Sequence, residues 1–198
     1  MIATKNVRQN ILDAAQLIVS NKGFSAVGLN EVLQAADVPK GSFYHYFGSK
    51  DAFGVALLDH YFDGYLEDMR QIFQQHGVSE SQKLMNYWQR WIANQTLLTD
   101  SGKCLAVKLG AEVTDLSEPM RAALDRGTSQ IIGLLAEALA RGVAEGSVTL
   151  DDQPGAVALR LYALWLGASV MAKITRTSVS FDEAMLMTRR TVGGADHH

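Results

Sequence analysis

The chain has 198 residues, of which 47% are hydrophobic and only three are prolines, enough apolar surface for a compact core. Its single cysteine excludes an internal disulfide, and no apolar run approaches the roughly 20 residues that span a bilayer, so we expect a cytoplasmic protein without a membrane partner. The net charge of −3 conceals an asymmetry, because residues 1–50 carry +2, which favours a polyanion partner for this end of the chain.

Apolar residues recur at spacings of three and four along almost the whole chain, which predicts an all-α fold. The first helix is expected from residue 4 or 5 to residue 21, closed by Gly23 in a left-handed conformation. A short connection leads to a second helix over residues 30–36. Ala35 and Ala36 in this helix are small enough to let the next helix cross closely.

Residues 38–50, VPKGSFYHYFGSK, carry the most informative pattern. Pro39 suits the first position of a helix and keeps Val38 extended, so a tight turn should separate two helices, as in a helix-turn-helix motif. If Phe43 and Phe47 face the core, the outward side carries donors for phosphates and base edges. The predicted DNA-binding residues are Lys40, Ser42, Tyr44, His45, Tyr46 and Lys50. The alternative interpretation is an aromatic-rich packing helix.

Ser49 is placed to cap a long fourth helix that continues past residue 65. A further helix is expected between the breaks at residues 77–81 and 101–102. The remaining helices are predicted over about residues 103–113, 118–145, 154–176 and 181–192, followed by a disordered tail at 193–198. The helix over 154–176 is apolar around more of its circumference than one inner face requires, which implies a second buried surface.

Several of these residues together resemble the DNA-binding signature of the TetR family of bacterial transcriptional repressors. The signature residues are Gly23, Phe24, Val32, Ala36, Val38, Gly41, Tyr44, Tyr46, Phe47, Ser49 and Lys50. The match extends over about residues 8–57, and the stretches 39–54, 104–120 and 162–173 are similar to an electrophile-responsive branch of the family.

The resemblance implies an N-terminal three-helix helix-turn-helix domain, residues 1–48, and a larger helical ligand-sensing and dimerisation domain, residues 49–192. It also implies a homodimer, a double-stranded DNA operator and a small-molecule or electrophile effector as partners. The last two long helices of each subunit would form the dimer interface. The interface residues that we predict are Leu161, Trp165, Leu166, Val170 and Met185.

Four positions depart from the family pattern. Val27 and Gly28 replace the usual threonine pair at the start of the first motif helix, although Gly28 can still cap it. Asp37 and Pro39 replace the usual glycine and serine of the turn. Capping of the recognition helix must therefore depend on backbone geometry and on Asp37.

Cys104 is the predicted sensor. It follows the break at residues 101–102, so a helix N-terminus, the adjoining Lys103 and Lys108 one turn later all favour its thiolate. Thiolates react with hypochlorite, quinones and reactive carbonyls. Lys173 is a further candidate for a charge partner. The alternative is that Cys104 is a structural core residue and that the protein senses a reversible apolar ligand.

The aromatic residues Tyr65, Tyr87, Trp88, Trp91 and Trp165 are candidates for lining a ligand pocket, or else they form the core. His60, Asp63 and Glu67 share one helix face, which we interpret as solvated, so we predict no metal and no cofactor.

Two functions of other classes compete with a repressor. An enzyme using Cys104 as its nucleophile lacks a readable general base, so we predict no enzymatic activity. The other is a helical protein-interaction module whose apolar C-terminal helix binds a partner. The leading prediction is a dimeric repressor released from a palindromic operator by electrophiles or by a small ligand.

Overall fold

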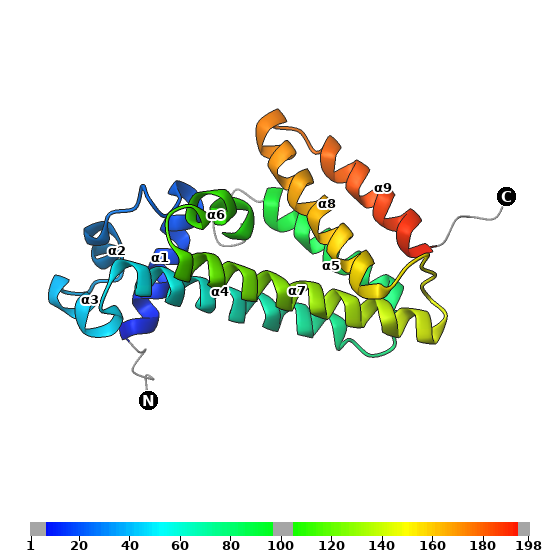
Figure 1. Ribbon diagram of the computed structural model, residues 1–198, viewed down its shortest axis with the longest axis horizontal. Helices are drawn as coiled ribbons and strands as arrows, with labels where there is room; N and C mark the ends of the chain where they lie inside the picture. The colour runs from blue at the N-terminus through cyan, green and yellow to red at the C-terminus, as the bar shows by residue number, and fades with distance from the viewer. Residues whose placement is uncertain (1–6, 97–104, 194–198) are drawn as a thin grey trace. The chain divides into compact units, whose positions relative to one another are not determined.

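The computed structural model describes residues 7–96 and 105–193, and these residues fold into helices and connecting turns (Figure 1). Residues 1–6, 97–104 and 194–198 lie outside this description. The helices are α1 (Val7–Lys22), α2 (Leu29–Ala35), α3 (Lys40–Phe47), α4 (Lys50–Phe73), α5 (Glu80–Thr96), α6 (Leu105–Thr114), α7 (Glu118–Glu145), α8 (Pro154–Thr175) and α9 (Val179–Gly193). The described ranges contain no β-strand, only an isolated bridge between Thr149 and Gly193, which confirms the predicted all-α class.

The chain forms two compact units. The first unit comprises the described residues of Met1–Gly64 and Leu97–Gly127, and the second comprises those of Tyr65–Thr96 and Thr128–His198. The long helices α4 and α7 therefore each contribute residues to both units.

The first unit is built around α1, which buries one stripe and ends as its sequence predicts. Its buried residues are Ile11, Leu12, Ala15, Val19 and Ser20. Gly23 follows α1 at φ +86, and its N–H bonds the Val19 carbonyl at 2.9 Å. This left-handed conformation is easily adopted only by glycine, so it closes the helix.

The turn between α2 and α3 depends on backbone geometry. Gly28 is the N-cap of α2, as expected, and it supplies no side-chain cap. Asp37 has φ 54, and the Val38 N–H bonds the Leu33 carbonyl at 3.0 Å. Pro39 is the N-cap residue of α3 rather than its first helical residue, because its ψ of 145 is extended. No side chain among the described residues caps α3, so Asp37 shapes the turn through its backbone instead.

Phenylalanines fix α3 against the start of α4. The Phe43, Phe47 and Phe53 rings lie 5.1–5.3 Å apart from centroid to centroid. The Ser49 hydroxyl accepts a hydrogen bond of 3.1 Å from the Ala52 N–H, so Ser49 caps α4 as predicted.

The second unit has an aromatic centre. Trp165 of α8 stacks on Trp88 of α5, with centroids 4.6 Å apart and planes 8° apart, and on Phe181 of α9 at 6.2 Å. The Trp165 indole N–H donates to the Thr188 hydroxyl at 2.9 Å, and that of Trp91 donates to the Ser169 hydroxyl at 2.9 Å. Helices α8 and α9 pack as an antiparallel hairpin, in which Trp165 contacts Phe181 and Thr188 (Figure 1).

Helix α8 is long and apolar enough to cross a membrane by length and composition alone. It has 22 residues, and an 18-residue window has a mean hydropathy of 1.5. The expectation that no apolar segment approaches this length was therefore wrong. Since 39% of that window is buried inside the protein, including Trp165, we interpret α8 as a core helix with a second apolar face.

Candidate nucleic-acid interface

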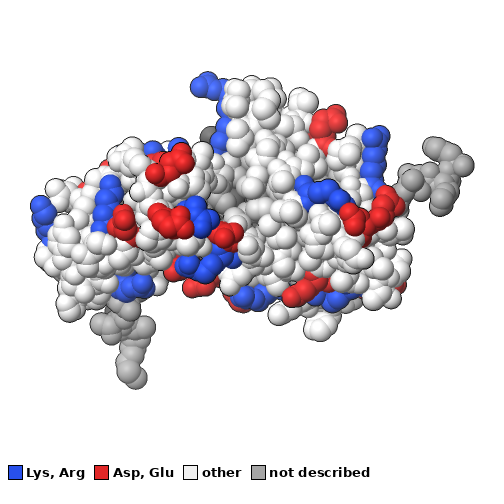
Figure 2. Space-filling model, viewed as in Figure 1, with Lys and Arg blue, Asp and Glu red and all other residues white. Residues whose placement is uncertain are grey.

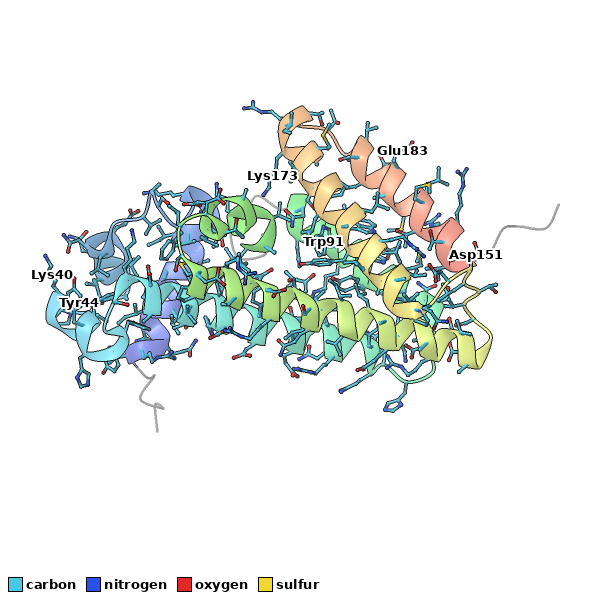
Figure 3. All side chains as sticks on the ribbon, in the orientation of Figure 1. Lys40, Tyr44, Trp91, Asp151, Lys173 and Glu183 are labelled. Carbon is cyan, nitrogen blue, oxygen red and sulfur yellow. The ribbon has the colours of Figure 1, made fainter. Side chains whose placement is uncertain are left out.

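Helix α3 has one buried side and one exposed side. Phe43 and Phe47 are only 1% and 6% exposed, whereas Tyr44 is 61% exposed and Lys40 and His45 are exposed as well. Figure 3 shows Lys40 and Tyr44 projecting from α3. A helix-turn-helix protein reads the major groove with the exposed side and the N-terminal residues of its second helix. The exposed side chains of α3 are therefore the ones expected from the spacing of the two phenylalanines.

The other predicted DNA-binding residues surround this face. Tyr46 is half-buried, and its ring packs edge-on against that of His45 at 5.0 Å. The Lys50 ammonium is exposed and lies 5.3 Å from the centre of the Phe24 ring, a cation–π contact that leaves its charge accessible. Ser42 belongs to α3, but its side chain lies outside the described structure.

Arg8 is a further cation near this face, and it is not among the residues predicted from the sequence. Its guanidinium lies 5.4 Å from the centre of the Phe47 ring, so α1 brings a positive charge to the end of α3. The sequence signal for a cation near α3 was the basic composition of residues 1–50. Composition alone does not identify which cation approaches α3.

Glu112 of α6 contacts the segment before α2. Its carboxylate accepts hydrogen bonds from the backbone N–H groups of Phe24, at 3.1 Å, and Ser25, at 2.6 Å. Partial burial raises the pKa of Glu112, but hydrogen bonds from Ser25 and Phe24 and the charge of Lys108 outweigh it, so this pKa lies below its ordinary value. Lys108, a predicted sensor residue, thus lies close enough to stabilise the Glu112 carboxylate.

Of the other two predicted sensor residues, the structure describes Lys173 but not Cys104. Cys104 lies outside the described residues, one position before α6 begins at Leu105. Lys173 is an exposed residue of α8 (Figure 3) that lines an open cavity of about 320 Å³ in the second unit. The other lining residues are Gln95, Ser169, Ala172, Arg176, Thr177, Ser178 and Phe181.

The five predicted pocket residues are packed closely together. Tyr65 and Tyr87 hydrogen-bond through their hydroxyls at 2.8 Å, and Trp91 extends from α5 towards α8 (Figure 3). These three residues line a cavity of only about 20 Å³, which has room for a single water molecule. Trp88 and Trp165 are fully buried. In the described ranges this set forms an aromatic core.

The predicted dimer residues fall on two sides of α8 and on α9. Leu161 and Trp165 are buried inside their own chain, at 4% and 0% exposed, so they do not belong to an exposed face. Val170 is 44% exposed, and Leu166 and Met185 are half-buried.

A partly exposed apolar stripe nevertheless runs along α8. It consists of Leu159, Leu166, Val170 and Ile174, and we call it the α8 stripe. Leu159 and Ile174 are 54% and 69% exposed. Leu186 and Met187 add exposed apolar surface on α9. Figure 2 shows a largely uncharged surface over the C-terminal half of α8.

His60 is held by structural contacts. Its imidazole lies 3.1 Å from the Asp13 carboxylate and 3.1 Å from the Gln9 amide nitrogen. Within residues 7–96 and 105–193, no three His, Cys, Asp or Glu side chains are grouped so as to hold a metal ion.

The comparisons with known proteins agree with this architecture. Residues 11–57 match the family model for bacterial regulatory proteins of the tetR family, and residues 80–187 match the tetracyclin repressor-like C-terminal domain. The HTH-type transcriptional repressor NemR of Escherichia coli (strain K12) is 37% identical, over 94% of each chain. The HTH-type transcriptional repressor DhaR of Mycobacterium sp. (strain GP1) is 30% identical, over 92% of this chain and 90% of its own.

Solved structures are similar over the same extent. The crystal structure of the reduced form of E. coli NemR has a TM-score of 0.87 at 38% identity, covering 95% of this chain and 98% of its own. A regulatory protein TetR from Rhodobacter sphaeroides has a TM-score of 0.83 at 29% identity, covering 94% and 98%.

Proposed function

We propose that this chain, which belongs to the TetR family and is a DNA-binding transcriptional repressor of that type, acts in the cytoplasm as a homodimer on a palindromic operator. Electrophiles acting at Cys104, or a small ligand in the second unit, release it. Its relatives are transcriptional regulators, so it is not a cysteine-nucleophile enzyme, and family membership removes the reason for a general helical interaction module.

The DNA-binding surface rests on the division of α3 between buried Phe43 and Phe47 and exposed Lys40 and Tyr44. Lys40 begins the helix and Tyr44 lies one turn later, so both occupy the N-terminal positions that reach base edges in other helix-turn-helix proteins. Tyr46 lies near the end of α3 and Lys50 at the start of α4, where we assign them to phosphates.

The experiment is DNA retardation with the purified chain and its own upstream region. Lys40→Ala should weaken specific binding by about 1–3 kcal/mol and relax the base preference at one position. Arg70→Ala is the matched control, because Arg70 is an exposed cation of α4 whose ion pair, with Glu67 at 3.5 Å, is on the surface. Equal binding by the two variants would reject the assignment of Lys40.

Dimerisation is supported by the α8 stripe and by Leu186 and Met187 on the neighbouring helix. Exposed apolar surface of this kind is typical of an interface that a second copy buries across a two-fold axis. Two recognition helices related by that axis would enter successive major grooves roughly 34–36 Å apart, which requires a palindromic operator.

Electrophile sensing is supported by the sequence around Cys104 and by the relative NemR, whose crystal structure is of a reduced form. A thiolate at Cys104 would react with electrophiles, and the added group would favour a conformation with lower operator affinity. A reversible ligand that binds without Cys104 chemistry is the second candidate, supported by the cavity of about 320 Å³ beside Lys173.

A further inference from the structure

A further cavity, of about 260 Å³, lies entirely within the first unit. It opens among α2, α3 and the start of α4, and it shares no lining residue with the small cavity in the aromatic core of the second unit. The lining residues are Val19, Phe24, Val27, Gly28, Leu29, Val32, Phe43, Tyr44, Lys50 and Phe53.

The chemistry of this lining specifies a class of ligand. Seven of the lining residues carry purely apolar side chains, and only Tyr44 and Lys50 bring polar groups. No acidic residue occurs among the described residues that line it, so the Lys50 ammonium is its one full charge. An apolar cavity with a single cation fits an apolar molecule that ends in one carboxylate.

The size of the cavity narrows this class further. Cavities for drug-sized ligands are usually about 300–1,000 Å³, so one of about 260 Å³ fits a smaller molecule, such as one aromatic ring on a short chain. The Phe24, Phe43 and Phe53 rings offer faces and edges for aromatic packing.

Gly28 keeps the rim of the cavity open. Its φ of −78 and ψ of 138 are available to any residue, and it occupies the N-cap position of α2, where Ser, Thr, Asp or Asn would add a hydrogen bond. A Cβ atom at Gly28 would meet no other atom within 4 Å. Neither backbone strain nor crowding requires a glycine here, but a larger residue would occupy space at the rim.

We propose that this cavity binds a small arylalkyl carboxylate, with its ring among the phenylalanines and its carboxylate on Lys50. Because Tyr44 and Lys50 also belong to the DNA-binding surface assigned above, the bound carboxylate competes with operator DNA. The competition rests on the proposed function, whereas binding of the carboxylate does not.

The test uses the full chain and 4-phenylbutyrate, with 4-phenylbutan-1-ol as its uncharged counterpart, measured by titration calorimetry without DNA. The acid should bind with a dissociation constant of about 0.1–1 mM, as expected for a ligand of about a dozen heavy atoms. The alcohol should bind about fivefold more weakly, because it lacks the charge that pairs with Lys50.

Two variants localise the binding. Gly28→Leu adds a side chain at the rim and should weaken binding of the acid at least tenfold, while Gly64→Leu, an exposed glycine of α4 that is also without neighbours within 4 Å, should leave it unchanged. Lys50→Gln should make the acid bind no better than the alcohol. Far-ultraviolet circular dichroism verifies that each variant is folded.

The outcomes separate the site from the function. Equal binding of the acid and alcohol, or equal binding of the acid by Gly28→Leu and Gly64→Leu, would reject the proposal that this cavity is the binding site. If the chain bound no operator DNA, the proposed function would fail, but calorimetry would still decide the site. If the acid bound as expected and did not displace a labelled operator at saturating concentration, the competition would be rejected.

Discussion

Glu112 accepts a 2.6 Å hydrogen bond from the backbone N–H of Ser25, across 87 positions of sequence. Helix α6, which carries Glu112, begins at the residue after Cys104, and Ser25 lies in the segment that leads into α2. Within the first unit, the Glu112 contact therefore links the helix next to the proposed sensor with the helix-turn-helix motif.

Replacement of this carboxylate should change stability in a pH-dependent way. The folded-state pKa of Glu112 lies below its ordinary value of 4.5. The contribution of this carboxylate to the free energy of unfolding is therefore fully present above pH 4.5 and is lost as the pH falls through the folded pKa. Glu112→Gln should lower the free energy of unfolding at pH 7 by about 1 kcal/mol, since it removes the charge from two hydrogen bonds. Urea unfolding at pH 7 and pH 3.5 measures the difference, which should shrink at the lower pH.

Glu137→Gln is the control for this change, because Glu137 is exposed on α7 and lies 3.9 Å from Arg141. Its effect at pH 7 should be near zero. A Glu112 variant as stable as this control at pH 7 would show that the contact to Ser25 contributes nothing.

Lys50 should contribute to the salt dependence of operator binding. If its ammonium contacts a phosphate, Lys50→Ala should weaken binding to specific and unrelated DNA alike and reduce the slope of log K against log salt concentration by about one. Fluorescence anisotropy from 50 to 200 mM salt measures the slope, with Arg70→Ala as the control. An unaltered slope would place Lys50 away from the phosphates.

The α8 stripe should control the oligomeric state. Val170→Glu and Ile174→Glu each place a charge on exposed apolar surface, so they should dissociate a dimer without disturbing the core of either chain. Analytical ultracentrifugation measures the mass. Leu116→Glu is the matched control, because Leu116 is 61% exposed but lies outside α8 and α9. A dimer that persisted in both stripe variants would require another interface.

The response to electrophiles should depend on Cys104. N-ethylmaleimide should add once to the chain, at its single thiol, and weaken operator binding without unfolding the protein. Cys104→Ser should bind the operator normally and lose the response, since serine is similar in size but forms no thiolate. Intact mass and DNA retardation are measured on the same samples.

Lys108→Gln and Lys173→Gln distinguish the roles of the two lysines. Removal of a lysine that favours the thiolate should slow the reaction with N-ethylmaleimide. Removal of a lysine with only a structural role should leave the rate unchanged. If Cys104→Ser still responded to electrophiles, sensing would be assigned to reversible ligand binding.

The helical fold was predictable from sequence because capping residues and apolar spacing agree. The predicted helices over 118–145 and 154–176 lie within one residue of α7 and α8, since Pro119 and Pro154 mark their starts. Side-chain caps were harder to predict. The Ser117 hydroxyl caps nothing and has no partner within the described part of the chain, whereas its carbonyl accepts the Arg121 N–H at 2.9 Å.

The part of the DNA-binding surface that depends on local periodicity could be predicted from the sequence. The spacing of Phe43 and Phe47 alone identifies the exposed side of α3. Glu112 could not be found this way, because its partners are 87 and 88 positions away. Periodicity also could not decide which side of α8 faces inwards, since apolar residues occur on all its sides. Trp165 is accordingly in the core and Val170 on the surface.

All three tryptophans of the chain belong to the aromatic centre of the second unit. Trp88 and Trp165, nearly parallel at 4.6 Å, are close enough for their electronic transitions to couple, and Trp91 lies 5.8 and 6.5 Å from them. The protein therefore carries a built-in optical reporter. Its near-ultraviolet circular dichroism and indole emission follow the packing of α5, α8 and α9, whereas the first unit, which contains α3, contributes only phenylalanine and tyrosine signals.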